Sequence, residues 1–167
     1  VDVSCFGSVD GEVSAGTIGG TPAYFYEWYD NAALTNNVGS GSPVTGLAAG
    51  TYYVEVTDAF GCTISAQVDV NEPVEMVVST SVADANCGQS DGTVSVVSTT
   101  GGSGVYVSEV WTDAGGLPVA DPNLVSSGTY TVIVTDDNGC TGTGIANVAD
   151  LVGPAISLMG SVPVSCN

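Results

Sequence analysis

Residues 50–63 read Gly-Thr-Tyr-Tyr-Val-Glu-Val-Thr-Asp-Ala-Phe-Gly-Cys-Thr, and residues 128–141 read Gly-Thr-Tyr-Thr-Val-Ile-Val-Thr-Asp-Asp-Asn-Gly-Cys-Thr. In both stretches a run with apolar residues at every second position leads into a Gly-containing turn, the pattern of a half-buried β-strand. Two stretches so similar in one chain of 167 residues indicate an internal repeat. We therefore predict an all-β fold built from repeated units.

Further landmarks recur in the same order around these stretches. The matched pairs are Cys5 and Cys87, Gly20 and Gly102, and Trp28 and Trp111. We predict two tandem Ig-like β-sandwich repeats, residues 1–73 and residues 74–154, each of roughly seven short strands. The leading strand of the first repeat is expected to be incomplete. Residues 155–167 are predicted to form the first strand of a following repeat.

Two kinds of aromatic residue have predicted structural roles. Tyr52 and Tyr130 each follow a Gly-Thr pair at the spacing of a tyrosine corner, in which the hydroxyl binds backbone upstream. A plain turn followed by a core tyrosine is the alternative. Trp28 and Trp111 are predicted to be core aromatic residues packed on a disulfide. A sugar-stacking platform is the alternative for the tryptophans.

The chain contains five cysteines, and its composition favours an extracellular setting in which small domains use disulfides. Repeat symmetry favours the pairs Cys5–Cys62 and Cys87–Cys140, because each repeat then carries one intradomain disulfide. Cys166 would be the first cysteine of the next repeat, with its partner outside this sequence. Cross-repeat pairing such as Cys62–Cys87, free thiols and a metal site are the alternatives.

The charge balance excludes several functions. The chain has 18 acidic residues and no Lys, Arg or His, for a formal net charge of −18. Nucleic-acid binding relies on Lys and Arg, so we expect no such partner. We also expect no direct membrane insertion, because Gly, Ser, Thr and Pro interrupt every uncharged stretch. Without His or Lys there is no base to activate a nucleophilic Ser or Thr, and we predict that the chain is not an enzyme.

Calcium is the one cofactor that the sequence suggests. Several aspartates lie near the cysteines, and carboxylates are the oxygen ligands that calcium prefers. These candidate ligands are Asp10, Asp58, Asp91, Asp136 and Asp137. The same residues also open turns, either in Asp-Gly pairs or ahead of the Gly-Cys pairs. We favour the turn interpretation and keep calcium as the alternative.

These motifs resemble the SprB repeat of Bacteroidetes surface proteins. Its units start with Cys-x-Gly-x-x-x-Gly, continue with a Gly-Gly-x-Pro segment and Tyr-x-Tyr-x-Trp, and close with Leu-x-x-Gly-x-Tyr-x-Val-x-Val-x-Asp-x-x-Gly-Cys. Residues 5–11, 19–28 and 47–62 supply these motifs. The second repeat departs from them, since Gly104 stands where Pro22 is. The resemblance implies a long, repetitive, secreted adhesin of the extracellular bacterial cell surface, serving surface attachment or gliding motility.

We predict that the chain is a structural stalk segment of a large bacterial cell-surface adhesin, holding an adhesive part away from the cell. Its expected partners are the neighbouring repeats of the same chain, and copies of itself in the case of assembly. One alternative is a self-assembling extracellular filament built by strand complementation between repeats, since edge strands without Lys are open to strand addition. A carbohydrate-binding module is the other alternative.

Overall fold

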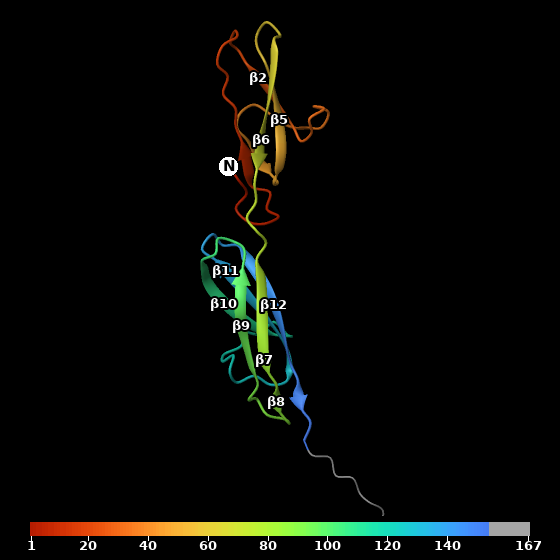
Figure 1. Cartoon of the computed structure of the whole chain (residues 1–167), viewed down its shortest axis with the longest axis vertical. Coiled ribbons are helices and arrows are strands. Elements are labelled where there is room, and N and C mark those ends of the chain that lie inside the picture. Colours follow the sequence, from red (N-terminus) through yellow and green to blue (C-terminus); the bar gives the residue numbers. More distant parts are fainter. Residues whose placement is uncertain (154–167) are drawn as a thin grey trace, which may run out of the picture. The chain divides into compact units, whose positions relative to one another are not determined.

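The computed structural model describes residues 1–153 of the chain, so the strand predicted within residues 155–167 lies outside the described residues. The described part contains thirteen strands and no helix (Figure 1), and the predicted all-β class is confirmed. Val, Thr and Tyr dominate these strands because such side chains fit a pleated, half-buried surface. Within residues 1–153 no helix long and apolar enough to span a bilayer is found.

The first six strands form one larger sheet and one strand pair. They are β1 (Gly11–Val13), β2 (Phe25–Tyr29), β3 (Asn37–Ser40), β4 (Val44–Leu47), β5 (Gly50–Thr57) and β6 (Thr63–Val70). The sheet has the order β3-β2-β5-β6, and all three of its strand pairs are antiparallel. β1 pairs with β4, also antiparallel. β6 is therefore an edge strand of its sheet.

The remaining strands form a separate set of sheets. They are β7 (Val77–Ala83), β8 (Ala85–Asn86), β9 (Thr93–Thr100), β10 (Tyr106–Asp113), β11 (Gly128–Asp136), β12 (Thr141–Val148) and β13 (Asp150–Leu151). β10-β11-β12 form one sheet, β7 pairs with β9, and β8 pairs in parallel with β13. Every strand pair of the described part thus lies wholly before residue 73 or wholly after it.

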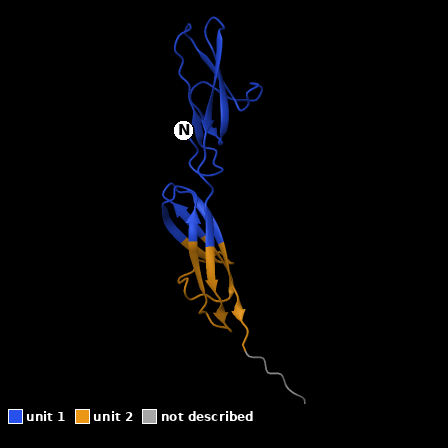
Figure 2. Ribbon diagram, viewed as in Figure 1, with its two compact units in different colours: residues 1–79, 98–109, 133–144 blue, residues 80–97, 110–132, 145–167 orange. Residues whose placement is uncertain are grey.

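By spatial contacts the chain divides into two compact units (Figure 2). One comprises residues 1–79, 98–109 and 133–144, and the other comprises residues 80–97, 110–132 and, within the described part, 145–153. The division cuts across β7, β9, β10, β11 and β12. It groups residues by proximity, whereas the repeats predicted above are units of sequence, so their boundaries stay a prediction.

The core beneath β5 has the alternation that the sequence predicts. Tyr52, Val54 and Val56 are buried together with Trp28, while the residues between them on β5 are partly exposed. Leu47, at the end of β4, is also buried in this cluster. β5 therefore turns one face to the core, as expected for a strand with a period of two.

The apolar residues of β6 also alternate, but they do not form a buried face. Of Ile64, Ala66, Val68 and Val70, only Val70 is buried. Ile64 is 67% exposed and Val68 is 40% exposed. β1 packs on this face only at its end, where a Cβ at Gly11 would lie 2.7 Å from the Val70 Cγ1, and the side chains of Ile64 and Val68 remain in solvent.

The equivalent face of β12 is covered. Its alternate residues, starting at Gly142, are all buried. A Cβ at Gly142 would lie only 2.8 Å from the Met76 Cβ and 3.1 Å from the Val78 Cγ2, so β7 and the residue before it pack directly on this strand. Burial of an alternating strand thus depends on a second segment of chain.

Candidate functional site

The structure contains one disulfide in its described part, between Cys5 and Cys140, with 5.5 Å between their Cα atoms. Cys62 and Cys87 are free thiols, and both are exposed. The predicted pairs Cys5–Cys62 and Cys87–Cys140 are therefore wrong. Cys166 lies outside the described residues.

The error has a simple origin. Repeat symmetry requires the same bond in every repeat, and a bond from each repeat to the following one satisfies that requirement equally well. Cys5 falls in the first predicted repeat and Cys140 in the second, so the observed bond is of the cross-repeat kind. The sequence alone does not distinguish these two arrangements. In a long array of repeats, either one gives every cysteine a single partner.

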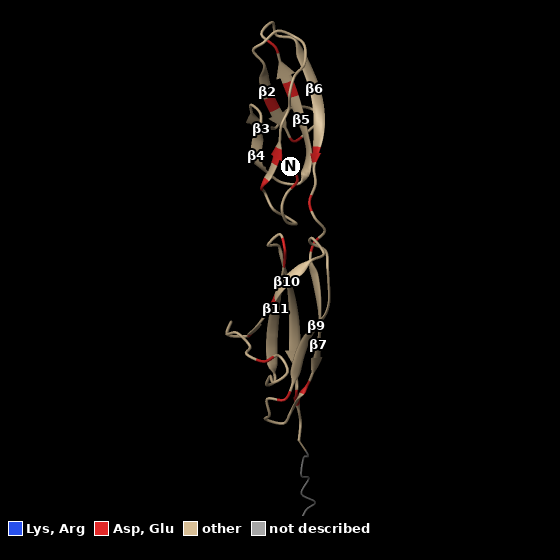
Figure 3. Cartoon of the chain, turned by 90° about the vertical axis from the view of Figure 1, so that its left-hand side faces the viewer, with Lys and Arg blue, Asp and Glu red and all other residues tan. Residues whose placement is uncertain are grey.

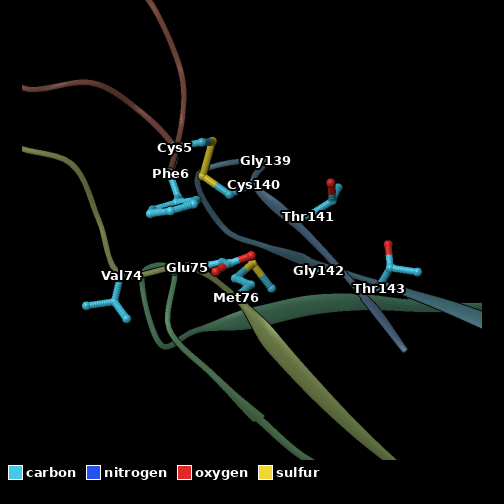
Figure 4. A pocket seen from close by; sticks show the side chains of 11 residues that line it. Cys5, Phe6, Val74, Glu75, Met76, Gly139, Cys140, Thr141, Gly142 and Thr143 are labelled. Atoms are coloured by element: carbon cyan, nitrogen blue, oxygen red, sulfur yellow. A yellow bond between two sulfur atoms is a disulfide. The ribbon is translucent and has the colours of Figure 1, made fainter. Parts of the chain in front are cut away.

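The disulfide borders a cavity of about 450 Å³ (Figure 4). Cys140 is buried, and its Sγ lies 3.2 Å from the Ser4 carbonyl oxygen. Phe6, the residue after Cys5, lines the cavity together with Glu75 and Met76 from the segment ahead of β7. The cavity and the disulfide lie within the compact unit that contains residues 1–79, 98–109 and 133–144.

Asp136 closes the turn that presents Cys140. Its Oδ1 accepts the N–H groups of Asn138 and Cys140 at 3.0 and 2.8 Å, and its Oδ2 accepts the N–H of Ser103 at 2.8 Å. The carboxylate is only 1% exposed. These hydrogen bonds, led by that from Ser103, hold the pKa of Asp136 below its ordinary value. The turn interpretation of Asp136 is confirmed.

Asp58 has the same role in the turn that presents Cys62. Its Oδ1 accepts the N–H groups of Phe60 and Cys62, both at 2.9 Å, and its Oδ2 accepts the N–H of Thr21 at 3.0 Å. The hydrogen bond from Cys62, followed by that from Thr21, lowers the pKa of Asp58. The structure thus builds the same carboxylate-centred turn twice.

Asp10 and Asp91 hold the loops that present the other two cysteines. The Asp10 Oδ1 accepts the Ser4 N–H at 3.0 Å, and the Asp91 Oδ1 accepts the Asn86 N–H at 2.8 Å. Hydrogen bonding to Ser4 lowers the pKa of Asp10, and hydrogen bonding to the Asn86 side chain, then to its backbone, lowers the pKa of Asp91. The predicted Asp-Gly turns are wrong, because Gly11 begins β1 and Gly92 forms a β-bridge with Val125; each aspartate instead closes the loop that precedes it.

Two further acidic residues accept hydrogen bonds from these loops, and the sequence analysis missed them. The Gly7 N–H donates to the Glu72 Oε2 at 2.9 Å, and the Gly88 N–H donates to the Asp150 Oδ1 at 3.2 Å. Each acidic residue comes two positions after the last buried valine of a strand, at Val70 and Val148. That matched position was a signal that could have identified the pair.

Four of the five candidate calcium ligands use side-chain oxygens to accept backbone N–H groups; they are Asp10, Asp58, Asp91 and Asp136. The described residues contain no group of three or more His, Cys, Asp or Glu side chains arranged to hold a metal ion. Asp137 is exposed, and its N–H donates to the Val105 carbonyl at 3.0 Å. The carboxylate oxygens of Asp58 and Asp136 point at backbone N–H groups. Calcium binding at these residues stays a prediction.

Both predicted tyrosine corners are confirmed. The Tyr52 hydroxyl donates to the Ala48 carbonyl and the Tyr130 hydroxyl donates to the Ser126 carbonyl, each at 2.9 Å. Each bond spans four residues, which is the arrangement expected of a corner between strands. Burial raises the pKa of Tyr52 because the ionised phenolate would lose its hydration.

The two tryptophans are core residues, as predicted, but the intradomain disulfides on which they were expected to pack do not form. Trp28 is 1% exposed and Trp111 is 4% exposed. The Trp28 Nε1–H donates to the Gly41 carbonyl at 2.9 Å, so its polar edge is satisfied while the ring is buried. Neither ring is available to stack on a sugar, and the platform interpretation of these residues is wrong.

The fold and the site together define an all-β protein with two tyrosine corners and a disulfide between Cys5 and Cys140. The model of a family described as the SprB repeat matches residues 1–33, about a fifth of the chain. The predicted resemblance is confirmed over this stretch, which includes the loop of Cys5 and all of β2.

Among solved structures, the chain is similar to one titled "Structure of amphioxus IgVJ-C2 molecule". The two are 14% identical, the match covers 85% of this chain and 97% of that chain, and the TM-score is 0.33. A TM-score of this size does not assign a fold. A search of curated proteins finds no match to the chain.

Proposed function

We propose that the chain is a spacer segment of a bacterial cell-surface adhesin, composed of two tandem Ig-like repeats. The observation that carries the proposal is the Cys5–Cys140 bond, which ties the first sequence repeat covalently to the second. A disulfide between repeats is a covalent link that resists their separation under load. The SprB match over residues 1–33 supports a role at the cell surface.

The surface chemistry also supports a spacer. No basic residue is present, and most acidic residues lie in loops or at strand ends (Figure 3). Like charges keep neighbouring copies apart at low ionic strength, and this repulsion is screened within about 10 Å at 0.1 M salt. The negative charge of these side chains therefore favours solubility and disfavours the binding of an anionic ligand. The partners of the segment are the neighbouring repeats of the same chain.

Small-angle scattering tests the spacer role. The protein is prepared with Cys62, Cys87 and Cys166 replaced by serine, so that copies are not cross-linked while Cys5–Cys140 is retained. A compact chain of this length has a radius of gyration of about 15 Å. We expect a clearly larger radius and a single species at low and high salt. A radius near the compact value would contradict the spacer role.

A filament assembled by strand addition is a second candidate function. It is favoured by β6, an edge strand on which seven of eight residues are exposed and which carries no Lys. A free edge of this kind pairs readily with an added strand. In the same scattering experiment this candidate predicts polymers with a distribution of lengths, although the free cysteines have been removed.

A further inference from the structure

The two free cysteines occupy the sequence places of the two bonded ones. Cys62 corresponds to Cys140 in the closing turns, which we define as residues 58–62 and 136–140. Cys87 corresponds to Cys5 in the leading loops, defined as residues 4–10 and 86–91. The observed disulfide joins one leading loop to one closing turn. One leading loop and one closing turn therefore remain with free thiols.

The closing turn of Cys62 has the conformation of the bonded one. The Asp58 N–H donates to the Cys62 carbonyl at 3.0 Å, and the Asp136 N–H donates to the Cys140 carbonyl at 2.9 Å. The aspartate side chains accept the same pair of turn N–H groups in both copies. The thiol of Cys62 is thus presented on the same frame as the bonded sulfur of Cys140.

The leading loop of Cys87 also matches its bonded counterpart. In each loop an aspartate accepts the N–H of the residue before the cysteine, at 3.0 Å for Asp10 and 2.8 Å for Asp91. In each loop a glycine N–H donates to an acidic residue that follows the last long strand of its repeat, Glu72 or Asp150. The hydrogen bonds that position Cys5 for its partner therefore position Cys87 as well.

The surroundings of the two closing turns differ in one respect. Beside Cys140, the segment ahead of β7 passes so close that a Cβ on Gly101 would lie 2.0 Å from the Glu75 carbonyl oxygen. At the matching place beside Cys62, a Cβ on Gly19 would meet no other described part of the chain within 4 Å. A cavity of about 180 Å³ lies there and is bordered by Cys62 itself. The turn of Cys62 has space for an incoming segment.

We propose that Cys62 and Cys87 are the two halves of a further disulfide of the Cys5–Cys140 kind, formed with another copy of this module. Cys62 bonds to the cysteine of a leading loop, and Cys87 bonds to the cysteine of a closing turn. Between two copies of this chain, Cys87 of one copy bonds Cys62 of the next. The contact is head-to-tail, so it propagates along an open array. This inference rests on the proposed spacer function and specifies how its modules are joined.

The bond forms by thiol–disulfide exchange with a small-molecule disulfide as oxidant. The Cys62 thiolate attacks one sulfur of oxidised glutathione, releasing one glutathione and leaving a mixed disulfide. The Cys87 thiolate of another copy then attacks the Cys62 sulfur and releases the second glutathione. Two protein thiols are oxidised, and one glutathione disulfide is reduced to two thiols. Both cysteines are exposed, so the reagent reaches them.

A complementation experiment tests the pairing. Two variants are made in a Cys166→Ser background, one with Cys62→Ser and the other with Cys87→Ser. Each is incubated with a glutathione redox buffer, alone and mixed in equal amounts. Products are resolved on a non-reducing gel and mapped after cleavage at acidic residues, because the chain offers no site for trypsin. Both substitutions change exposed side chains, and unchanged unfolding midpoints show that the fold is retained.

We expect the mixture to form Cys62–Cys87 dimers in about tenfold excess over both symmetric dimers together, whereas random pairing gives equal amounts. Neither variant incubated alone should form a comparable amount of dimer. Random proportions, glutathione adducts without dimer, or loss of Cys5–Cys140 to new pairings would overturn the proposal. These outcomes leave the radius of gyration of the variant lacking Cys62, Cys87 and Cys166 unaffected, so the spacer function is judged separately.

Discussion

Residues 1–73 and residues 74–153 share their turns but differ in how their strands are covered. The turn of Cys62 and the turn of Cys140 have the same hydrogen bonds around an aspartate. Yet Cys62 is exposed, whereas Cys140 is buried and bonded. The strands that follow these turns differ in the same way, because β6 is almost wholly exposed and β12 alternates between buried and exposed residues.

This comparison separates two levels of structure. Turns form from residues close in sequence, so two similar sequences give two similar turns. Burial requires a second segment to pack on the first. Met76 and Val78 pack on the start of β12, whereas on β6 only Val70, which lies beside Gly11 of β1, is buried. A residue such as Ile64 is therefore apolar and exposed without any defect in its own strand.

The largest expected effect concerns the disulfide. Replacing Cys5 and Cys140 together by alanine should lower the free energy of unfolding by about 5 kcal/mol, the loop-entropy value for cysteines 135 residues apart. Cys62→Ala should change it by less than about 0.5 kcal/mol, because that side chain is exposed and unbonded. Equilibrium unfolding in guanidinium chloride measures both. Equal losses of stability in the Cys5/Cys140 double variant and in Cys62→Ala would contradict the difference between the bonded and the free cysteines.

A change in the size of one side chain on each strand tests how tightly that strand is covered. Gly142→Ala should cost about 1–3 kcal/mol by overpacking, since its Cβ would lie 2.8 Å from that of Met76. Ile64→Ala, at the matching place on β6, should change stability by less than about 0.5 kcal/mol. Thermal unfolding of the two variants provides the comparison. A stable Gly142→Ala variant would show that β7 moves freely over β12.

The tyrosine corners should respond alike, since they are built alike. Tyr52→Phe and Tyr130→Phe each remove one hydroxyl bond to a carbonyl four residues upstream. Each should lose about 1 kcal/mol of stability, the usual net contribution of one hydrogen bond. Chemical denaturation of both variants measures the loss. A marked difference between them would indicate that coverage of the neighbouring strands also determines the strength of the corner.

The smallest expected effect is the pH dependence contributed by the leading loops. The pKa values of Asp10 and Asp91 are lowered in the folded chain, so ionisation of each stabilises the fold above the unfolded pKa of about 4. That stability is lost as the pH falls through the lower, folded values.

Asp10→Asn and Asp91→Asn should therefore each be slightly less stable than the parent chain at pH 7. The difference should disappear once the pH is well below 4, where the parent carboxyl groups are protonated too. Urea unfolding at a series of pH values checks this. A difference that persisted at low pH would mean that the asparagine disturbs the loop for a reason other than charge.

Much of the local structure was predictable from the sequence. The alternation of Tyr52, Val54 and Val56, the tyrosine corners and the aspartate turns all follow from residues within a few positions of one another. The buried tryptophans also followed, because large aromatic residues on alternating strands usually face a core. The acidic partners Glu72 and Asp150 were missed because they act on loops more than 60 residues away.

The sequence by itself determined the β class, the turns and the residues able to form a core, since these depend on residue type and short spacing. Tertiary structure alone decided which cysteines meet and which apolar face is covered. The reason is physical: Cys5 reaches Cys140 across 135 positions, and β12 is buried by a segment more than 60 residues upstream. Contacts over such distances follow from how folded segments pack, and a local pattern carries no record of them.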